Sequence, residues 1–402
     1  MQNHKKPTAK ALLTAFLVLV FVIDVKSQAG TVHNDPWWKG LVIETDGLLG
    51  KQVRNFHNYP QNGSSEYFNL NIAVKCFGTR YWHSYWRYPQ VGIAFLYGYL
   101  GNPDVLGSNF SLLPNLTLES RDHRRIITDV TIGGGLSWFN KPFDRVKNPD
   151  NLIIGTHITD IVFLSWNLRK SLGRYFALTG GLSFIHCSDG HYQLPNLGMN
   201  TFAFNVGLKY YPYGKPTAFK DSTLRTVIDK RLMWNVRLGY GVHEFGTATQ
   251  TTGSPKYPVY ILNVYASKRV GKISNLHAGI FLSYDAASYD YIYTHGYYKK
   301  KQRMNSCVLT VFLGHEFILG RFGLIAQSGI NVFNPFRREY LKMTYGIGIQ
   351  TKIKTWWSNK MGVQFYLLKP ENNKRFNIWI GTYIKANFFT ADYIESSVGI
   401  RF

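Results

Sequence analysis

The sequence predicts an all-β protein, a transmembrane antiparallel β-barrel of about sixteen strands. Aromatic side chains make up 16% of its 402 residues and 37 residues are glycine, yet the mean hydropathy is only −0.16. Strands that alternate apolar and polar residues give such a near-zero mean, whereas a helical membrane protein would be far more apolar. Runs of about ten to fourteen alternating residues, separated by polar or glycine-rich breaks, fit tilted membrane strands and their turns.

The first 29 residues resemble a secretory signal peptide. Three lysines precede an apolar stretch from Ala11 to Ile23, and Ser27–Ala29 offers small residues for cleavage. This stretch is shorter than the roughly 20 residues that a membrane-spanning helix needs. We therefore expect residues 1–29 to be a signal peptide and assign them no part in the fold.

After Trp37 the chain repeats one pattern, an alternating run followed by a polar or glycine-rich break, and sixteen or seventeen strand-like runs can be distinguished. Bacterial single-chain barrels normally have an even number of strands, so sixteen are expected. The clearest predicted strands, all with the alternating pattern, are Ser65–Cys76, Gln90–Leu100, Arg124–Phe139, Thr156–Arg169, Arg174–Ser188, Thr201–Tyr213, Arg231–Phe245, Val259–Arg269, Asn305–Ile318, Arg321–Phe333, Tyr340–Ile353 and Phe376–Ala386.

The final run, Tyr393–Phe402, ends in a phenylalanine. It resembles the C-terminal strand by which outer-membrane barrels are recognised for assembly. We therefore expect the bacterial outer membrane as the location and the barrel-assembly machinery as a partner during insertion.

A weak internal duplication divides the chain into two halves, 30–214 and 231–402, joined by a segment of mixed charge at 215–230. Trp37–Gly101 and Trp234–Asp285 each open with a glycine-containing strand, a polar loop and two further strands. Two arrangements remain open at this point. The halves form either one merged barrel or two tandem eight-stranded units.

The charge balance points to an anionic lipid partner. Lys and Arg number 46 against 23 Asp and Glu, a formal charge of +23. In a soluble protein this excess would suggest nucleic acid, but here the basic residues are scattered through turns and strand ends, as in Arg121–Arg125 and Lys299–Arg303. Arg and Lys pair well with phosphate. We therefore expect phosphorylated outer-membrane lipids as partners and no nucleic acid.

The cysteines and histidines predict neither a disulfide framework nor a metal site. Three cysteines lie far apart and are odd in number. The histidines outside the motif described next lack the spacing of metal ligands with acidic partners. No metal or cofactor is expected.

The most informative motif lies at the end of the predicted strand Arg174–Ser188. His186 and Ser188 are two positions apart, so their side chains project from the same face of the strand. The even-numbered residues of this strand are the bulkier and more apolar set, which predicts that this face contacts lipid. An imidazole beside a hydroxyl is the minimum for an activated serine nucleophile.

This pair predicts ester hydrolysis on a substrate that already lies in the bilayer. His186 would take the proton of Ser188, whose oxygen attacks an acyl carbonyl, and the imidazolium would then protonate the leaving alkoxide. Backbone N–H groups near Asp189 and Gly190 would stabilise the oxyanion.

Around this pair the chain resembles the PagL-type lipid A 3-O-deacylase family, including its acyloxyacyl-hydrolase-like members from Bacteroidetes. The family hallmark is His-x-Ser-Asn-(Gly/Ala), a polar loop, and Pro-Asn-x-Gly-x-Asn/acid. Gly133–Trp138, Lys141–Asp144 and the ending Ala391–Phe402 are similar as well. The specific resemblance covers residues 133–207 and the C-terminus. The hallmark residues in this chain are His186, Ser188, Asp189, Gly190, Pro195, Asn196, Gly198 and Asn200.

The resemblance implies an outer-membrane enzyme that removes an ester-linked acyl chain from lipid A, the lipid anchor of lipopolysaccharide. By the same resemblance, Ser188 is the nucleophile, His186 the base and Asn200 the third catalytic member. Support of the oxyanion and the loop falls to Asp189, Gly190, Asn196 and Gly198.

Two positions depart from the family pattern. Asp189 replaces an asparagine on the oxyanion side, where a carboxylate opposes negative charge unless it turns away or is protonated. Asn200 stands where the best-known members have an acid, and an amide stabilises an imidazolium less than a carboxylate does. Asp189 or Asp160 would be the alternative source of that charge. The departures therefore imply slow catalysis or, as the alternative, a binding role without catalysis.

Two other classes of function fit the sequence. A sixteen-stranded barrel can enclose water, and the basic excess would favour anions, as in a porin. A structural or adhesive barrel would contact its partners through long loops such as Lys51–Ser64 and Tyr289–Lys301.

Overall fold

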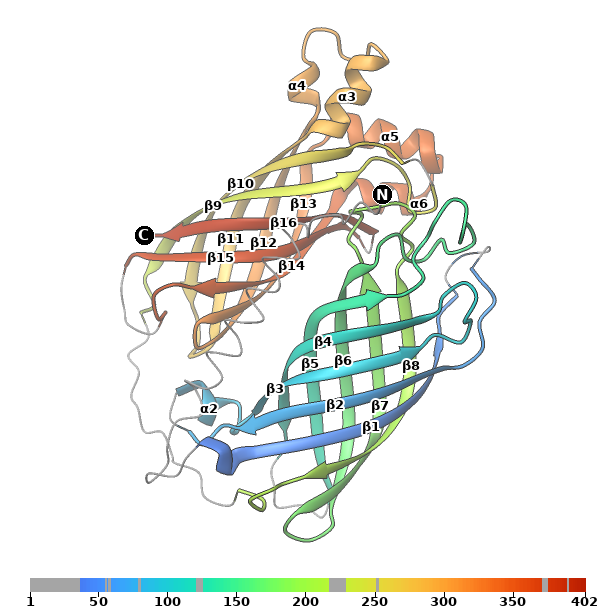
Figure 1. Ribbon diagram of the computed structural model, residues 1–402. Coiled ribbons are helices and arrows are strands. Elements are labelled where there is room, and N and C mark those ends of the chain that lie inside the picture. Colours follow the sequence, from blue (N-terminus) through green and yellow to red (C-terminus); the bar gives the residue numbers. More distant parts are fainter. Residues whose placement is uncertain are drawn as a thin grey trace, which may run out of the picture. The chain divides into compact units, whose positions relative to one another are not determined.

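The computed structural model describes residues 37–54, 56, 59–78, 81–120, 126–216, 229–250, 253–370, 375–388 and 390–402. The predicted signal peptide and most of the predicted connector 215–230 lie outside these ranges. The described residues form sixteen strands, eight in each of two closed antiparallel barrels (Figure 1). Among them, no helix combines the length and the apolar character needed to cross a membrane.

In the first barrel each strand pairs with the next, and β8 closes the sheet by pairing with β1, with Phe204 opposite Leu49. A short 3-10 helix, Trp37–Gly40, precedes the first strand, and helix α2 (Tyr81–Tyr85) lies between the second and third. The strands are β1 (Leu41–Gln52), β2 (Ser65–Lys75), β3 (Gln90–Tyr99), β4 (Ser108–Glu119), β5 (Ile126–Phe139), β6 (Ile158–Ser171), β7 (Phe176–Ser188) and β8 (Met199–Tyr210).

The second barrel has the same up-and-down order and closes between β16 and β9. The predicted number of strands is confirmed, and of the two arrangements left open the structure has two tandem eight-stranded units, not one merged barrel. Its elements are β9 (Leu232–Glu244), β10 (Lys256–Arg269), β11 (Ser274–Asp285), α3 (Ala286–Thr294), α4 (Gln302–Asn305), β12 (Cys307–Leu319), β13 (Phe322–Phe333), α5 (Pro335–Tyr345), α6 (Ile349–Trp356), β14 (Trp357–Tyr366), β15 (Asn377–Asn387) and β16 (Thr390–Arg401).

One predicted strand is wrong. Tyr340–Ile353 belongs to helices α5 and α6, and the strand that follows β13 is β14. The buried residues of α6, Thr351 and Thr355, are four positions apart, the spacing of one helix face. The alternation of Ile347, Ile349 and neighbouring glycines imitates a strand, yet these two isoleucines are exposed.

The strands of the first barrel are apolar outside and polar inside. On β8, Phe202, Phe204 and Val206 are 61%, 73% and 65% exposed, whereas Thr201 and Asn205 are buried. An outward apolar band around a polar interior is the pattern of outer-membrane barrels.

Buried ion pairs fill the interior of this barrel toward its short-turn end. Arg169 bonds Asp129 at 2.9 Å and Glu119 at 2.7 Å. Lys209 lies 3.0 Å from Asp129, and Lys75 lies 2.8 Å from Glu119. Each of these buried charges is thus paired with an opposite charge, which offsets the cost of burial in a low dielectric.

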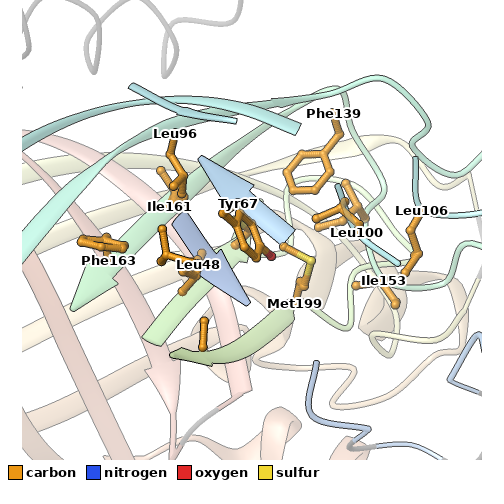
Figure 2. Packing of buried hydrophobic residues seen from close by; sticks show 14 of the residues in the cluster. Leu48, Tyr67, Leu96, Leu100, Leu106, Phe139, Ile153, Ile161, Phe163 and Met199 are labelled. Carbon is orange, nitrogen blue, oxygen red and sulfur yellow. The ribbon is translucent and has the colours of Figure 1, made fainter. Parts of the chain in front are cut away.

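An apolar cluster fills the first barrel toward its other end, where the longer loops enter it (Figure 2). Leu100, Leu106 and Ile153 come from these loops and pack against strand residues such as Leu48 and Tyr67. Ile185, Cys187 and Met199 belong to the same cluster. Close packing beneath the ends of β7 and β8 therefore holds their backbones in place.

Candidate active site

The predicted motif lies at the end of β7, where the chain enters the loop 189–198. Leu178 and Leu182 of β7 are 46% and 47% exposed, while Ile185 and Cys187 are fully buried. His186 and Ser188 share the outward parity and are partly exposed. The structure confirms the outward face predicted for the even-numbered residues of this strand.

A hydrogen bond from the neighbouring strand orients the imidazole. His186 and Asn200 are opposite each other in the β7–β8 register, and His186 Nδ1 lies 2.7 Å from Asn200 Oδ1. An amide oxygen only accepts, so Nδ1 carries the proton and donates it. In a neutral imidazole the other nitrogen, Nε2, is then an acceptor.

The Ser188 hydroxyl has its own fixed partner in the loop. The side-chain amide of Asn196, itself buried, donates to Ser188 Oγ at 3.0 Å. Sequence reasoning placed Asn196 among the loop supports but did not predict this contact, because its distance depends on how the loop folds back.

Gly198 lies between the two motif side chains. It has a φ of +70°, and a Cβ added there would lie 3.5 Å from His186 Cε1 and 3.6 Å from Ser188 Cβ. The imidazole and the serine therefore flank one backbone position. Gly190, at a φ of +63°, and His191, at +73°, are further left-handed positions of the loop.

Backbone hydrogen bonds tie the site loop to the connection between β5 and β6. Leu197 N donates to Leu152 O at 3.2 Å, and Gly198 N donates to Ile153 O at 3.1 Å. Because Ile153 also belongs to the apolar cluster, the loop is held by the same packing that supports β7.

Two carboxylates lie near the motif in different settings. Asp160 of β6 is opposite Ser188 in register and shares the outward parity of that strand. The Asp189 side chain is buried, with 1% exposure, and does not accompany His186 on the open outer face. The hydrogen bond from the imidazole Nδ1 of His186 is accepted by the amide oxygen of Asn200, not by either carboxylate.

Another histidine close in sequence is poorly suited to act as the base. His191 is buried, and its Nε2 lies 3.1 Å from the carbonyl oxygen of Gly246. Burial lowers the pKa of His191 to about 4, so its imidazole accepts a proton weakly at neutral pH. Among the histidines adjoining this motif, His186 remains the candidate base.

Comparison with solved structures finds low overall similarity. The crystal structure of the outer membrane enzyme PagL is 15% identical, with a TM-score of 0.30 over 41% of this chain and 97% of that chain. Neisserial surface protein A is 9% identical, with a TM-score of 0.28 over 43% of this chain and 97% of that chain. No curated protein matches the sequence.

Comparison with family models is more specific. Residues 66–209 match the model of lipid A 3-O-deacylase (PagL), which covers most of the first barrel. Residues 232–402 match the C-terminal domain of acyloxyacyl hydrolase in the PagL series, which covers the second barrel. The chain is thus a bacterial outer-membrane β-barrel protein that belongs to the PagL family.

Proposed function

We propose that this protein is a serine esterase that removes an ester-linked acyl chain from lipid A. One observation carries the proposal. The outward-facing His186 is oriented by Asn200 through a 2.7 Å hydrogen bond, and it flanks Gly198 together with Ser188. Membership of a family described as lipid A 3-O-deacylase supports the choice of substrate.

The position of the pair suits a substrate in the outer leaflet. Connections after odd-numbered strands of the first barrel, such as 140–157, are longer on average than those after even-numbered strands, such as 172–175. Long loops of outer-membrane barrels are extracellular. The end of β7 therefore lies on the side of the membrane where lipid A resides, and its outward face meets acyl chains.

The proposed reaction follows from the tautomer of His186. Nε2 accepts the proton of Ser188 as Oγ attacks the ester carbonyl, and a tetrahedral intermediate forms. The imidazolium then protonates the leaving sugar oxygen, the C–O bond breaks, and the acyl chain remains on Ser188. Water, deprotonated by the same imidazole, then attacks the acyl-serine. The imidazolium returns this proton to Ser188 Oγ as the acyl C–O bond breaks, which releases a fatty acid and regenerates Ser188.

Asn196 is a candidate for stabilising the oxyanion. Its Nδ2 already lies within hydrogen-bonding distance of Ser188 Oγ, the attacking atom. The negative charge of the tetrahedral intermediate would develop on the carbonyl oxygen, close to this position. Removing one such donor typically costs about 3 kcal/mol of transition-state stabilisation. Backbone N–H groups at Asp189 and Gly190 would add to it, and burial of the Asp189 side chain keeps that carboxyl away from the open outer face.

Replacing either motif residue tests the proposal. Ser188→Ala and His186→Ala should each lower deacylation about a thousandfold or more, because the nucleophile and its base act as a unit. Mass spectrometry of lipid A from cells that express each variant measures the loss. Heat-modifiable migration in gels shows whether the barrel is folded.

Ser183→Ala is the matched control. Ser183 lies on the same strand but faces inward, where it bonds Ser165 at 3.0 Å. This variant should keep wild-type activity. The esterase assignment would be abandoned if a folded Ser188→Ala protein deacylated lipid A as fast as the wild type.

A further inference from the structure

The second barrel carries a strongly basic surface on its long-loop end. Its long connections are 286–306, with α3 and α4, and 334–356, with α5 and α6. The connections at the opposite end include the short turns 270–273 and 320–321. Figure 1 shows the four helices gathered at one end of strands β9–β16. Because long loops of such barrels are extracellular, this end faces the outer surface of the membrane.

Aromatic packing joins these connections into one platform. The rings of Phe245 and Tyr340 are 4.8 Å apart, and those of Tyr291 and Phe336 are 5.3 Å apart. Phe245 directly follows β9, Tyr291 belongs to α3, and Phe336 and Tyr340 belong to α5. Side chains on the helices are thus presented by a packed surface.

The platform displays cations in large excess. The two long connections contain nine Lys and Arg residues but only two carboxylates, Asp290 and Glu339. Glu339 is shared by Arg338 and Lys342, at 3.2 and 3.3 Å, and Arg337 pairs with Asp392 at 2.7 Å. The remaining cations of these two connections form no ion pair among the described residues, and we call them the basic cap. They are Lys299, Lys300, Lys301, Arg303, Lys352 and Lys354.

Exposed apolar side chains lie close in the chain to Lys352 and Lys354 of the basic cap. Ile347 and Ile349 are 88% and 76% exposed, and Trp356 is 49% exposed. Isoleucines exposed to water are unfavourable, so a surface that is only solvated would not explain them. A surface that contacts the phosphates and the acyl boundary of a lipid layer would explain both the lysines and the isoleucines.

We propose that the basic cap is a second lipid A-binding surface, which binds the phosphate groups of the headgroup. Lysines contact phosphate as point charges, and a group of lysines near an anionic lipid surface is attracted to it. Binding here does not involve Ser188, and it stands whether or not the esterase proposal does. The second barrel would then concentrate phosphorylated lipid around the protein.

Equilibrium binding tests the proposal in the full-length protein. Ser188→Ala serves as the background, so that no substrate is consumed if the esterase proposal is correct. The protein in detergent micelles is titrated with bisphosphorylated lipid A and, separately, with lipid A stripped of its phosphates. The test variant combines Lys299→Glu, Lys300→Glu and Lys301→Glu. The control combines Lys268→Glu, Lys272→Glu and Lys369→Glu, which change the charge equally at the short-turn end.

The test variant should weaken binding of bisphosphorylated lipid A by about tenfold or more, while the control changes it little. Binding of the dephosphorylated lipid should not depend on either set. Replacing the same three cap lysines by glutamine should give a smaller loss, and it serves if the glutamate variant fails to fold. Equal affinities for test variant and wild type would overturn the proposal, as would an equal loss with the control or with dephosphorylated lipid.

Discussion

At the scale of single residues, the candidate site has an amide, Asn200, at the position where the family hallmark allows an asparagine or an acid. Asn200 Oδ1 holds His186 Nδ1 at 2.7 Å and so selects the tautomer that leaves Nε2 free to accept a proton. The amide orients the ring without supplying a negative charge. In the proposed mechanism, the imidazolium that would form during attack would therefore receive less stabilisation than a carboxylate would give.

Asn200→Asp should raise the deacylation rate about three- to tenfold at neutral pH, because a carboxylate at the same position stabilises the imidazolium. The initial rate of fatty acid release from purified lipid A measures the change. Asn200→Ala is the companion variant and should lose activity, since nothing then orients the ring. A clear fall in rate for Asn200→Asp would show that Asn200 is not the orienting group.

At the scale of elements, the loop 189–198 brings Asn196 and Gly198 against the end of β7. Its backbone is bonded to the connection between β5 and β6, and that connection is packed into the apolar cluster. The loop requires a left-handed backbone at Gly198, which other residues adopt only with strain.

Gly198→Ala should lower activity about tenfold or more. A φ of +70° costs an alanine roughly 1 kcal/mol, and relief of that strain shifts the backbone between His186 and Ser188. Gly173→Ala is the matched control, because Gly173 has a φ of +91° in the turn before β7 and open space around it. The control should lose comparable stability in urea but keep its activity. Equal activities for the two variants would refute this role of Gly198.

At the scale of the whole molecule, the described interiors of both barrels are occupied by side chains. Eight strands enclose a space just wide enough for side chains to fill. In the second barrel Lys360 bonds Glu395 at 2.7 Å, and His277 lies 3.2 Å from Glu316. These buried pairs, with those of Arg169 and Lys209 in the first barrel, argue against an open aqueous channel.

We therefore expect no ion conductance. Protein reconstituted into a planar lipid bilayer should show no stable current steps at moderate voltage, with a sixteen-stranded porin as the positive control. Stable ohmic steps would revive the channel that the sequence left open as an alternative function.

Local patterns were enough to predict the barrel class, the number of strands and the face that carries His186 and Ser188. Apolar and polar residues alternate with a period of two, and this period appears in each strand without knowledge of its neighbours. The same rule failed at Tyr340–Ile353. Alternating isoleucines and glycines there imitate a strand, whereas helix α5 begins at Pro335 and its buried face is set by the loops that it packs against.

Only the tertiary structure decided which strands pair to close a sheet, and therefore that there are two barrels. Strand pairing joins residues far apart in the chain, such as Leu49 and Phe204, and alternation within one strand carries no record of its partner. The contacts of Asn200 with His186 and of Asn196 with Ser188 have the same origin. They depend on the β7–β8 register and on the path of the loop, both of which are settled by packing across the barrel.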